Sequence, residues 1–233
     1  MKEPIILLHG WGLQGNKYKE IASYFTKRGH AVFTPDMPGF GSEKLSSSSL
    51  FLKDYVAFIH TVVKRNKLKN IIFIGHSFGG RVLLKYVAMY PESVKKIIMT
   101  GVPIIRHTSL RKKTGFLVAK IGGLIVLFFP SFIKQLLRKI LYRFIGEWDY
   151  YKAGPLQQIF KNIISEDLLQ YAKKITVPTF LIWGENDTFT PATDVEEIKK
   201  IIPHAKSVIV EGSSHKLPYE HPLAFIKAVE KFL

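Results

Sequence analysis

A short glycine-bounded motif limits the folds open to this chain. Residues 75–79 read Gly-His-Ser-Phe-Gly, and they lie between an apolar run at 70–74 and a helical pattern at 80–90. In that context the G-x-S-x-G pattern predicts a nucleophile elbow, in which a strand turns sharply into a helix and the serine is held on a strained turn. The flanking glycines let two backbone segments approach closely. Taken alone, the motif also fits a Ser77 that merely caps a helix N-terminus.

Two polar loops offer partners for Ser77, and each follows its own predicted strand. Asp187 comes after the apolar run 178–182, and His215 comes after the run 207–210. The chain order serine, acid, histidine is the one that the elbow architecture expects. In this arrangement Asp187 orients the His215 imidazole, and His215 takes the proton from Ser77 and later passes it to the leaving group.

Alternative interpretations of both partners stay open. Asp187 is also typical of an Asx turn, and His215 of an ordinary polar loop. Glu185 is a rival acid, although it lies close to the strand end, and His221 is a rival base that directly precedes Pro222 and the final helix. We rank Asp187 and His215 above these rivals.

A second glycine-bounded loop follows the first predicted strand, residues 4–8. It reads His-Gly-Trp-Gly at 9–12, and we expect the Trp11 backbone N–H to form an oxyanion hole with the Phe78 backbone N–H. The N-terminus of the helix after Ser77 adds its positive dipole end at the same place. The turn therefore presents both a nucleophile and donors for an anion.

Two further histidines accompany these motifs, and both are expected to be structural. His9 stands at a strand end, where a side chain typically hydrogen-bonds neighbouring loops and holds the turn. His76 precedes the candidate nucleophile and is expected to face into the fold.

These motifs carry a resemblance that extends over nearly the whole chain. The chain resembles the α/β-hydrolases, in the branch of small serine carboxylesterases that bear a lid. The stretch 9–13 is particularly similar to that of carboxylesterases that cleave methyl esters of pimeloyl-carrier protein, although no other part of the chain singles them out. The matching stretches are residues 9–12, 36–42 and 75–80, Asp187 with Pro191, and His215 with Glu220 and Pro222.

The chain departs from the family pattern in two places. Ser214 stands where many members have a glycine immediately before the histidine. Met1 stands almost on the strand that the family counts as its third. The resemblance therefore implies an α/β-hydrolase fold whose first two strands are missing and whose sheet is short and wholly parallel.

Strands and helices alternate along most of the sequence. Buried apolar runs predict six strands, at residues 4–8, 31–35, 70–74, 96–100, 179–183 and 207–210. Helical patterns predict helices at 18–28, 50–65, 81–90, 193–201 and 223–233, with Ser49 as a candidate N-cap. This α/β alternation predicts right-handed crossovers, helices on both faces and a site at the carboxyl ends of the strands.

The alternation stops between the two halves of the chain. We expect a core of residues 1–103 and 173–233, and a helical lid at 104–172. The apolar segment 116–129 is interrupted by glycines and ends before Pro130, so it is shorter than the roughly 20 residues of a membrane-spanning helix. The following segment, 132–145, predicts an amphipathic helix with one basic face.

The lid carries much of the positive charge. The chain has a formal net charge of +16, and residues 104–146 contain nine Lys and Arg and no Asp or Glu. Three explanations stay open: a solvated basic face above an acyl pocket, peripheral contact with an anionic membrane, and docking of an acidic carrier protein. Nucleic-acid binding is not expected, because no nucleic-acid module accompanies the charge.

Length and composition agree with one enzyme domain and its lid. The 233 residues suit a single α/β core, and the absence of cysteine excludes a disulfide scaffold and a thiol nucleophile. Met1 leads directly into a core strand without a signal-peptide pattern, so a cytoplasmic protein is expected.

The identity of the nucleophile selects the chemistry. Family relatives that open epoxides or displace halide use aspartate where this chain has Ser77, and the oxyanion loop differs from the His-Gly-Gly-Pro-Gly type of proline iminopeptidases. We expect a serine esterase for small to medium acyl chains that needs no metal or organic cofactor. The alternatives are a monoacylglycerol or lysophospholipid lipase, a carbon–carbon bond hydrolase, and a ligand receptor or binding scaffold without turnover.

Overall fold

The computed structural model describes residues 2–107, 133 and 153–233. The predictions for the apolar segment 116–129, and for nearly all of the amphipathic segment 132–145 and the basic stretch 104–146, lie outside the described residues. Within the described ranges, no helix combines the length and the apolar character that crossing a membrane requires.

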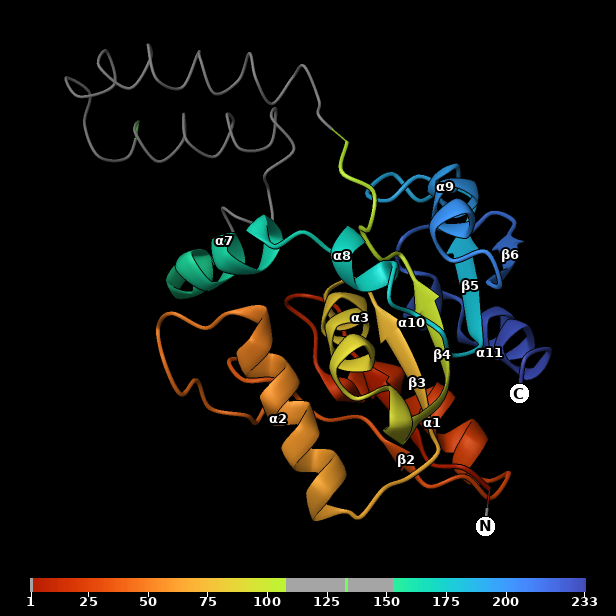
Figure 1. Cartoon of the computed structure of the whole chain (residues 1–233), viewed down its shortest axis with the longest axis horizontal. Helices are drawn as coiled ribbons and strands as arrows, with labels where there is room; N and C mark the ends of the chain where they lie inside the picture. The colour runs from red at the N-terminus through yellow and green to blue at the C-terminus, as the bar shows by residue number, and fades with distance from the viewer. Residues whose placement is uncertain (1, 108–132, 134–152) are drawn as a thin grey trace. The chain divides into compact units, whose positions relative to one another are not determined.

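The described core is built on a six-stranded sheet in which every neighbouring pair is parallel (Figure 1). The strand order is β2-β1-β3-β4-β5-β6. The strands are β1 Ile5–Leu8, β2 Val32–Phe33, β3 Ile71–His76, β4 Val94–Thr100, β5 Thr179–Gly184 and β6 Lys206–Val210. The prediction of a short, wholly parallel sheet of six strands is confirmed.

All six strands differ in length from their predictions, β2 by the most. β2 is an edge strand of only Val32–Phe33, and Pro35, which lacks a backbone N–H, lies just beyond it. β3 continues past the predicted end at Ile74, because Gly75 pairs with Met99 and His76 pairs with Thr100 of β4. The sheet therefore carries the chain to the residue directly before Ser77.

At least one helix follows each of the six strands, as the alternation predicts. They are α1 Lys19–Thr26, α2 Leu52–Arg65, α3 Phe78–Met89, α8 Leu169–Ala172, α9 Asp194–Ile201, α10 Leu217–Glu220 and α11 Pro222–Glu230, with 3-10 turns η1 Gly15–Tyr18 and η2 Pro91–Ser93. α3 begins at Phe78 rather than at Arg81, since the elbow passes directly into the helix. Ser49 is not the N-cap of α2: that position belongs to Phe51, whose backbone N–H donates to Asp54 Oδ2 at 2.7 Å.

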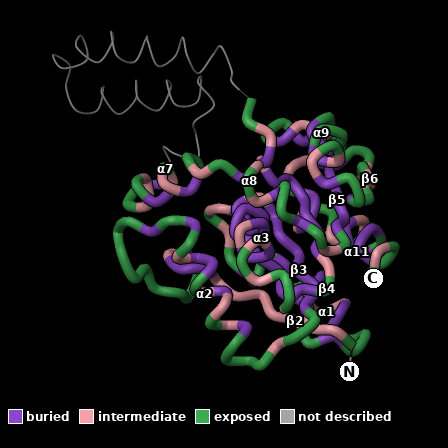
Figure 2. Tube along the Cα trace, in the orientation of Figure 1, coloured by how far each residue is buried: buried purple, intermediate pink, exposed green. Residues whose placement is uncertain are grey.

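Helices cover both faces of the sheet, with the buried residues concentrated between the layers (Figure 2). On one face, α1 and α11 pack over β1, β3, β4 and β5, where Phe25 and Phe225 join Ile182 in a continuous apolar cluster. On the other face α3 lies against β3, with the Tyr86 and Phe73 ring centroids 5.0 Å apart, and α2 packs beside α3. Apolar burial on both faces explains why β3 is apolar at nearly every position.

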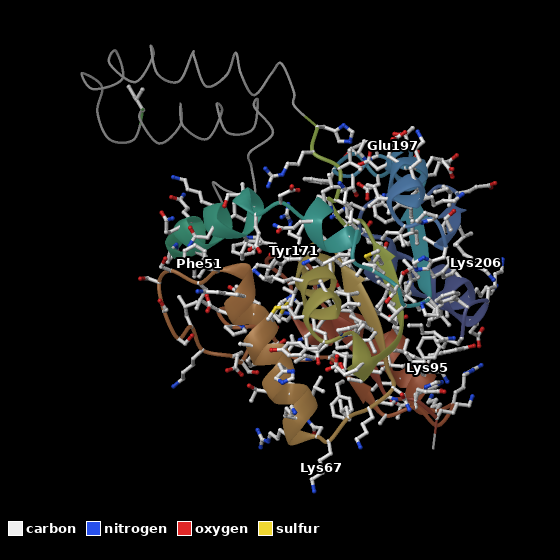
Figure 3. All side chains as sticks on the ribbon, in the orientation of Figure 1. Phe51, Lys67, Lys95, Tyr171, Glu197 and Lys206 are labelled. Atoms are coloured by element: carbon white, nitrogen blue, oxygen red, sulfur yellow. The ribbon has the colours of Figure 1, made fainter. Side chains whose placement is uncertain are left out.

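The chain divides into two compact units, Met1–Ile105 with Glu166–Leu233, and Arg106–Ser165. The sequence boundary, at 104 and 172, assigns α8 to the lid, whereas the contacts place α8 in the first unit. The reason lies in three side chains: Lys85 of α3 pairs with Glu166, and Tyr171 of α8, labelled in Figure 3, donates a hydrogen bond to the same carboxylate. The lid as a whole stays a prediction.

The described part of the second unit contains η3 Gly154–Leu156 and α7 Gln157–Ser165. Arg106, at the beginning of this unit, donates from its guanidinium to the Ser165 carbonyl oxygen at 2.6 Å. The last carbonyl groups of a helix have no N–H donor within the helix, and a cationic side chain at that end can donate to them. The two ends of the inserted segment are thereby joined.

Candidate active site

Ser77 occupies the sharp turn that its motif predicts. It lies between the last residue of β3 and the first residue of α3, with φ +51° and ψ −111°, a backbone conformation that side-chain-bearing residues rarely adopt. Gly79 makes the turn sterically accessible, because a Cβ atom there would lie 2.3 Å from the Leu8 carbonyl oxygen. Because it directly follows β3, this strained residue lies at the carboxyl end of the sheet.

Relief of this strain gives a stability prediction. We expect the free energy of unfolding of Ser77→Gly to exceed that of Ser77→Ala by about 1 kcal/mol. Glycine relieves a backbone strain of about 1–3 kcal/mol in the folded state, and the greater entropy of its unfolded chain offsets part of that gain. Alanine is the matched reference, since it also lacks the hydroxyl but keeps the Cβ atom. The measurement is thermal unfolding, with an expected difference of about 2–4 °C. Equal midpoints for the two variants would contradict a strained Ser77.

Asp187 and His215 form a hydrogen-bonded pair. His215 Nδ1 lies 2.8 Å from Asp187 Oδ2, and the Asp187 side chain is 1% exposed against 16% for the imidazole. Asp187 follows β5, and His215 lies between β6 and α10, so two loops at the carboxyl end of the sheet bring them together. A buried carboxylate that accepts from Nδ1 fixes the tautomer that leaves Nε2 free to accept a proton.

The rest of the Asp187 carboxylate is also fully engaged. Oδ1 accepts from the backbone N–H groups of Phe189 and Thr190, each at 2.9 Å, and Oδ2 also accepts from the Thr190 hydroxyl at 2.8 Å. Burial alone would raise the pKa of Asp187, but the hydrogen bond and charge of His215, with the Thr190 donors, hold it below its usual value. Asp187 thus forms the Asx turn of the alternative interpretation and also holds the histidine.

Ser77 and the histidine loop meet where β3 and β4 end. The Ser77 N–H donates to the Thr100 carbonyl oxygen at 3.0 Å. The next residue, Gly101, has φ +59°, and a Cβ atom there would lie 2.7 Å from His215 Cε1. No hydrogen bond joins the Ser77 hydroxyl to His215 within the described residues, and such contacts often tighten only when substrate binds.

The two predicted oxyanion donors belong to adjoining segments. Phe78 is the first residue of α3, where backbone N–H groups have no acceptor within the helix. The Trp11 ring packs edge-to-face on the Phe78 ring, with centroids 5.4 Å apart, and on Phe40 at 5.0 Å. The aromatic contacts keep the loop after β1 beside the elbow.

Among the described residues, neither rival residue is hydrogen-bonded to Asp187, His215 or Ser77. Glu185 Oε2 accepts from the Gly212 N–H at 2.9 Å and so ties the β5 and β6 loops together. His221 is exposed and stands at the N-cap of α11.

His9, expected to be structural, is completely buried. Its Nε2 accepts from the Met37 N–H at 3.0 Å, and this hydrogen bond joins the loops after β1 and β2. Burial lowers the pKa of His9, in keeping with a neutral ring.

Three residues at this site are not singled out by the sequence motifs. Thr190 and Gly101 support the Asp187–His215 pair, and Tyr18 contacts His76. The spacing of Thr190, three residues after Asp187, is typical of a turn held by the aspartate side chain, so this signal in the sequence could have indicated Thr190. The described residues contain no group of three or more His, Cys, Asp or Glu side chains that could hold a metal ion.

Comparisons with known proteins agree with this architecture. The family model Hydrolase_4, described as serine aminopeptidase, S33, matches residues 1–222. The chain is similar to Lipase 1 of Psychrobacter immobilis, with 25% identity covering 91% of this chain and 71% of that protein. It is also similar to the pimeloyl-[acyl-carrier protein] methyl ester esterase of Wigglesworthia glossinidia brevipalpis, with 27% identity covering 98% and 93% of the two chains.

Solved structures show the same fold. An esterase from Exiguobacterium antarcticum superposes with a TM-score of 0.75 at 20% identity, covering 99% of this chain and 91% of that one. The parallel sheet, the strained serine and the family match together lead to one conclusion. This chain belongs to the Hydrolase_4 family of α/β-hydrolases and is a carboxylic ester hydrolase of the esterase and lipase group.

Proposed function

We propose that Ser77 is the nucleophile of a serine esterase that acts on small to medium acyl chains. The observation that carries the proposal is the buried Asp187 carboxylate, 2.8 Å from His215 Nδ1, beside a serine with φ +51°. His215 accepts the Ser77 proton at Nε2, the serine attacks the ester carbonyl, and the alkoxide leaves with that proton. Water then releases the acid from the acyl-enzyme by the same steps in reverse order.

The Trp11 and Phe78 backbone N–H groups are proposed to bind the oxyanion that forms in each step. Donors that are already oriented stabilise developing charge without reorganisation, and one such donor contributes about 10²–10³ in kcat. The packing of the Trp11 ring against the Phe78 ring supports this assignment, because it keeps the two segments together.

A lipase acting on longer acyl chains is the second candidate. The similarity to Lipase 1 favours it, and so does the large excess of positive charge, +16 for the chain. Basic surfaces attract anionic lipid headgroups. The two candidates share the same triad and differ in the acyl chain length that they prefer.

One assay series tests the proposal and separates the candidates. The purified chain is given p-nitrophenyl esters from acetyl to palmitoyl, with alanine p-nitroanilide added because the family description names an aminopeptidase. We expect the highest kcat/KM on acyl chains of short or medium length and no turnover of the anilide. A maximum at palmitoyl would favour the lipase, and turnover of the anilide alone would overturn ester hydrolysis.

A further inference from the structure

A chain of buried polar groups connects the oxyanion loop to the histidine loop. The Gly10 N–H donates to the Tyr18 hydroxyl oxygen at 3.3 Å, and that hydroxyl lies 2.8 Å from His76 Nδ1. On the other side of the ring, His76 Nε2 lies 2.9 Å from the His215 carbonyl oxygen. The chain passes through His76, the residue directly before Ser77.

The direction of each hydrogen bond follows from its partners. A carbonyl oxygen can only accept, so His76 Nε2 carries a proton and donates to His215. Burial, assisted by the nearby His215 ring, lowers the pKa of His76 to about 3, so the ring is neutral and Nδ1 has no proton. The Tyr18 hydroxyl therefore accepts from Gly10 and donates to His76 Nδ1.

The groups are also locked by packing. Tyr18 is fully buried and His76 is 2% exposed. A Cβ atom added at Gly10 would lie 2.8 Å from His76 Nδ1, so the oxyanion loop rests directly on the imidazole. The Tyr219 ring of α10 contacts both the Tyr18 and His76 rings at centroid distances of 6.2 and 5.9 Å.

We propose that His76 and Tyr18 are positioning residues, which hold the Gly10–Trp11 loop and the His215 backbone in fixed places on either side of Ser77. The His76 ring packs beside the His215 ring, with centroids 5.1 Å apart, but among the described residues neither Tyr18 nor His76 is hydrogen-bonded to the Ser77 hydroxyl or to the His215 imidazole. The Nε2–H group of the His76 ring holds the His215 main chain, from which the His215 imidazole projects. The Tyr18 hydroxyl fixes both the tautomer of the His76 ring and the position of the oxyanion loop. This inference rests on the proposed function of Ser77 and His215.

Two substitutions at His76 separate its hydrogen bonds. The amide of His76→Gln reaches the position of Nε2 and can still donate to the His215 carbonyl oxygen, whereas the shorter amide of His76→Asn reaches only the position of Nδ1. We expect His76→Asn to lower kcat by about 10- to 100-fold with little change in KM, because a misplacement of about 1 Å has effects of that size. His76→Gln keeps the donor to His215 but loses the acceptor of the Tyr18 hydroxyl, so its kcat is expected to lie between those of the wild type and His76→Asn.

Tyr18→Phe provides a second variant with the same ring and volume. We expect its kcat to fall by about tenfold or more. The matched control is Tyr24→Phe, because the Tyr24 hydroxyl donates to Glu230 on an exposed surface, and its removal takes no hydrogen bond from the candidate site. The rate at which a fluorophosphonate labels Ser77 is measured in parallel, because it reports the reactivity of the nucleophile without a bound ester.

Each outcome decides between a positioning and a purely structural role. Equal kcat for His76→Asn and His76→Gln, at matched thermal midpoints, would overturn the inference, and so would a loss that appears only in KM. A Tyr18→Phe protein in which the fluorophosphonate labels Ser77 at the wild-type rate would also overturn it. If Ser77→Ala keeps full ester turnover, the proposed function itself is wrong, so the two failures are distinguished.

Discussion

Substitution of Ser77 by alanine is expected to lower kcat for ester hydrolysis by about 10⁴- to 10⁶-fold. The physical reason is that the acyl-enzyme cannot form without the hydroxyl, whereas the Asp187–His215 pair and the oxyanion loop stay in place. A residual rate over water is expected, because donors to the oxyanion and substrate binding contribute without the nucleophile. The measurement is initial-rate hydrolysis of the best p-nitrophenyl ester.

A second serine provides the control for this experiment. Ser93 lies in η2, directly before β4, and its hydroxyl donates to the Tyr90 carbonyl oxygen at the amino end of that strand. Ser93→Ala is expected to keep the wild-type rate. A Ser77→Ala protein that is folded and hydrolyses esters as fast as Ser93→Ala would rule out Ser77 as the nucleophile.

Much of the core could be predicted from the sequence because its signals are local. Six apolar runs gave six parallel strands, and the carboxyl end of each strand lies near the residue where its run stops. The elbow could be predicted for the same reason, since glycine spacing and a strand-to-helix switch occur within a few residues of Ser77. The partners Asp187 and His215 were predicted from their places after strands, and their hydrogen bond follows from the topology.

The remaining features depend on contacts between distant segments. The Tyr18 hydroxyl meets His76 across 58 positions of sequence, and no local pattern marks either residue as part of a hydrogen-bond chain. The short β2 depends on its place at the sheet edge, which apolar content does not show. The explanations for the basic stretch 104–146 stay predictions, because nearly all of it lies outside the described residues.

Asp187→Asn is expected to lower kcat by about 10⁴-fold while the fold is preserved. Asp187 Oδ1 accepts from two backbone N–H groups, those of Phe189 and Thr190, and an asparagine must place its carbonyl oxygen there. Its NH₂ group then occupies the position of Oδ2 and donates to His215 Nδ1. The imidazole proton is forced to Nε2, which can no longer accept the proton of Ser77. The measurement is kcat at a pH where the wild type is fully active.

The neighbouring carboxylate makes this prediction selective. Glu185 lies on the same loop and accepts from the Gly212 N–H, so Glu185→Gln removes one charge near the site but keeps an acceptor for that bond. We expect Glu185→Gln to retain a kcat close to that of the wild type. If loss of charge alone were responsible, the two variants would be impaired alike, and the tautomer argument would fail. A large loss confined to Asp187→Asn would instead identify the tautomer of the His215 ring as the property that Asp187 controls.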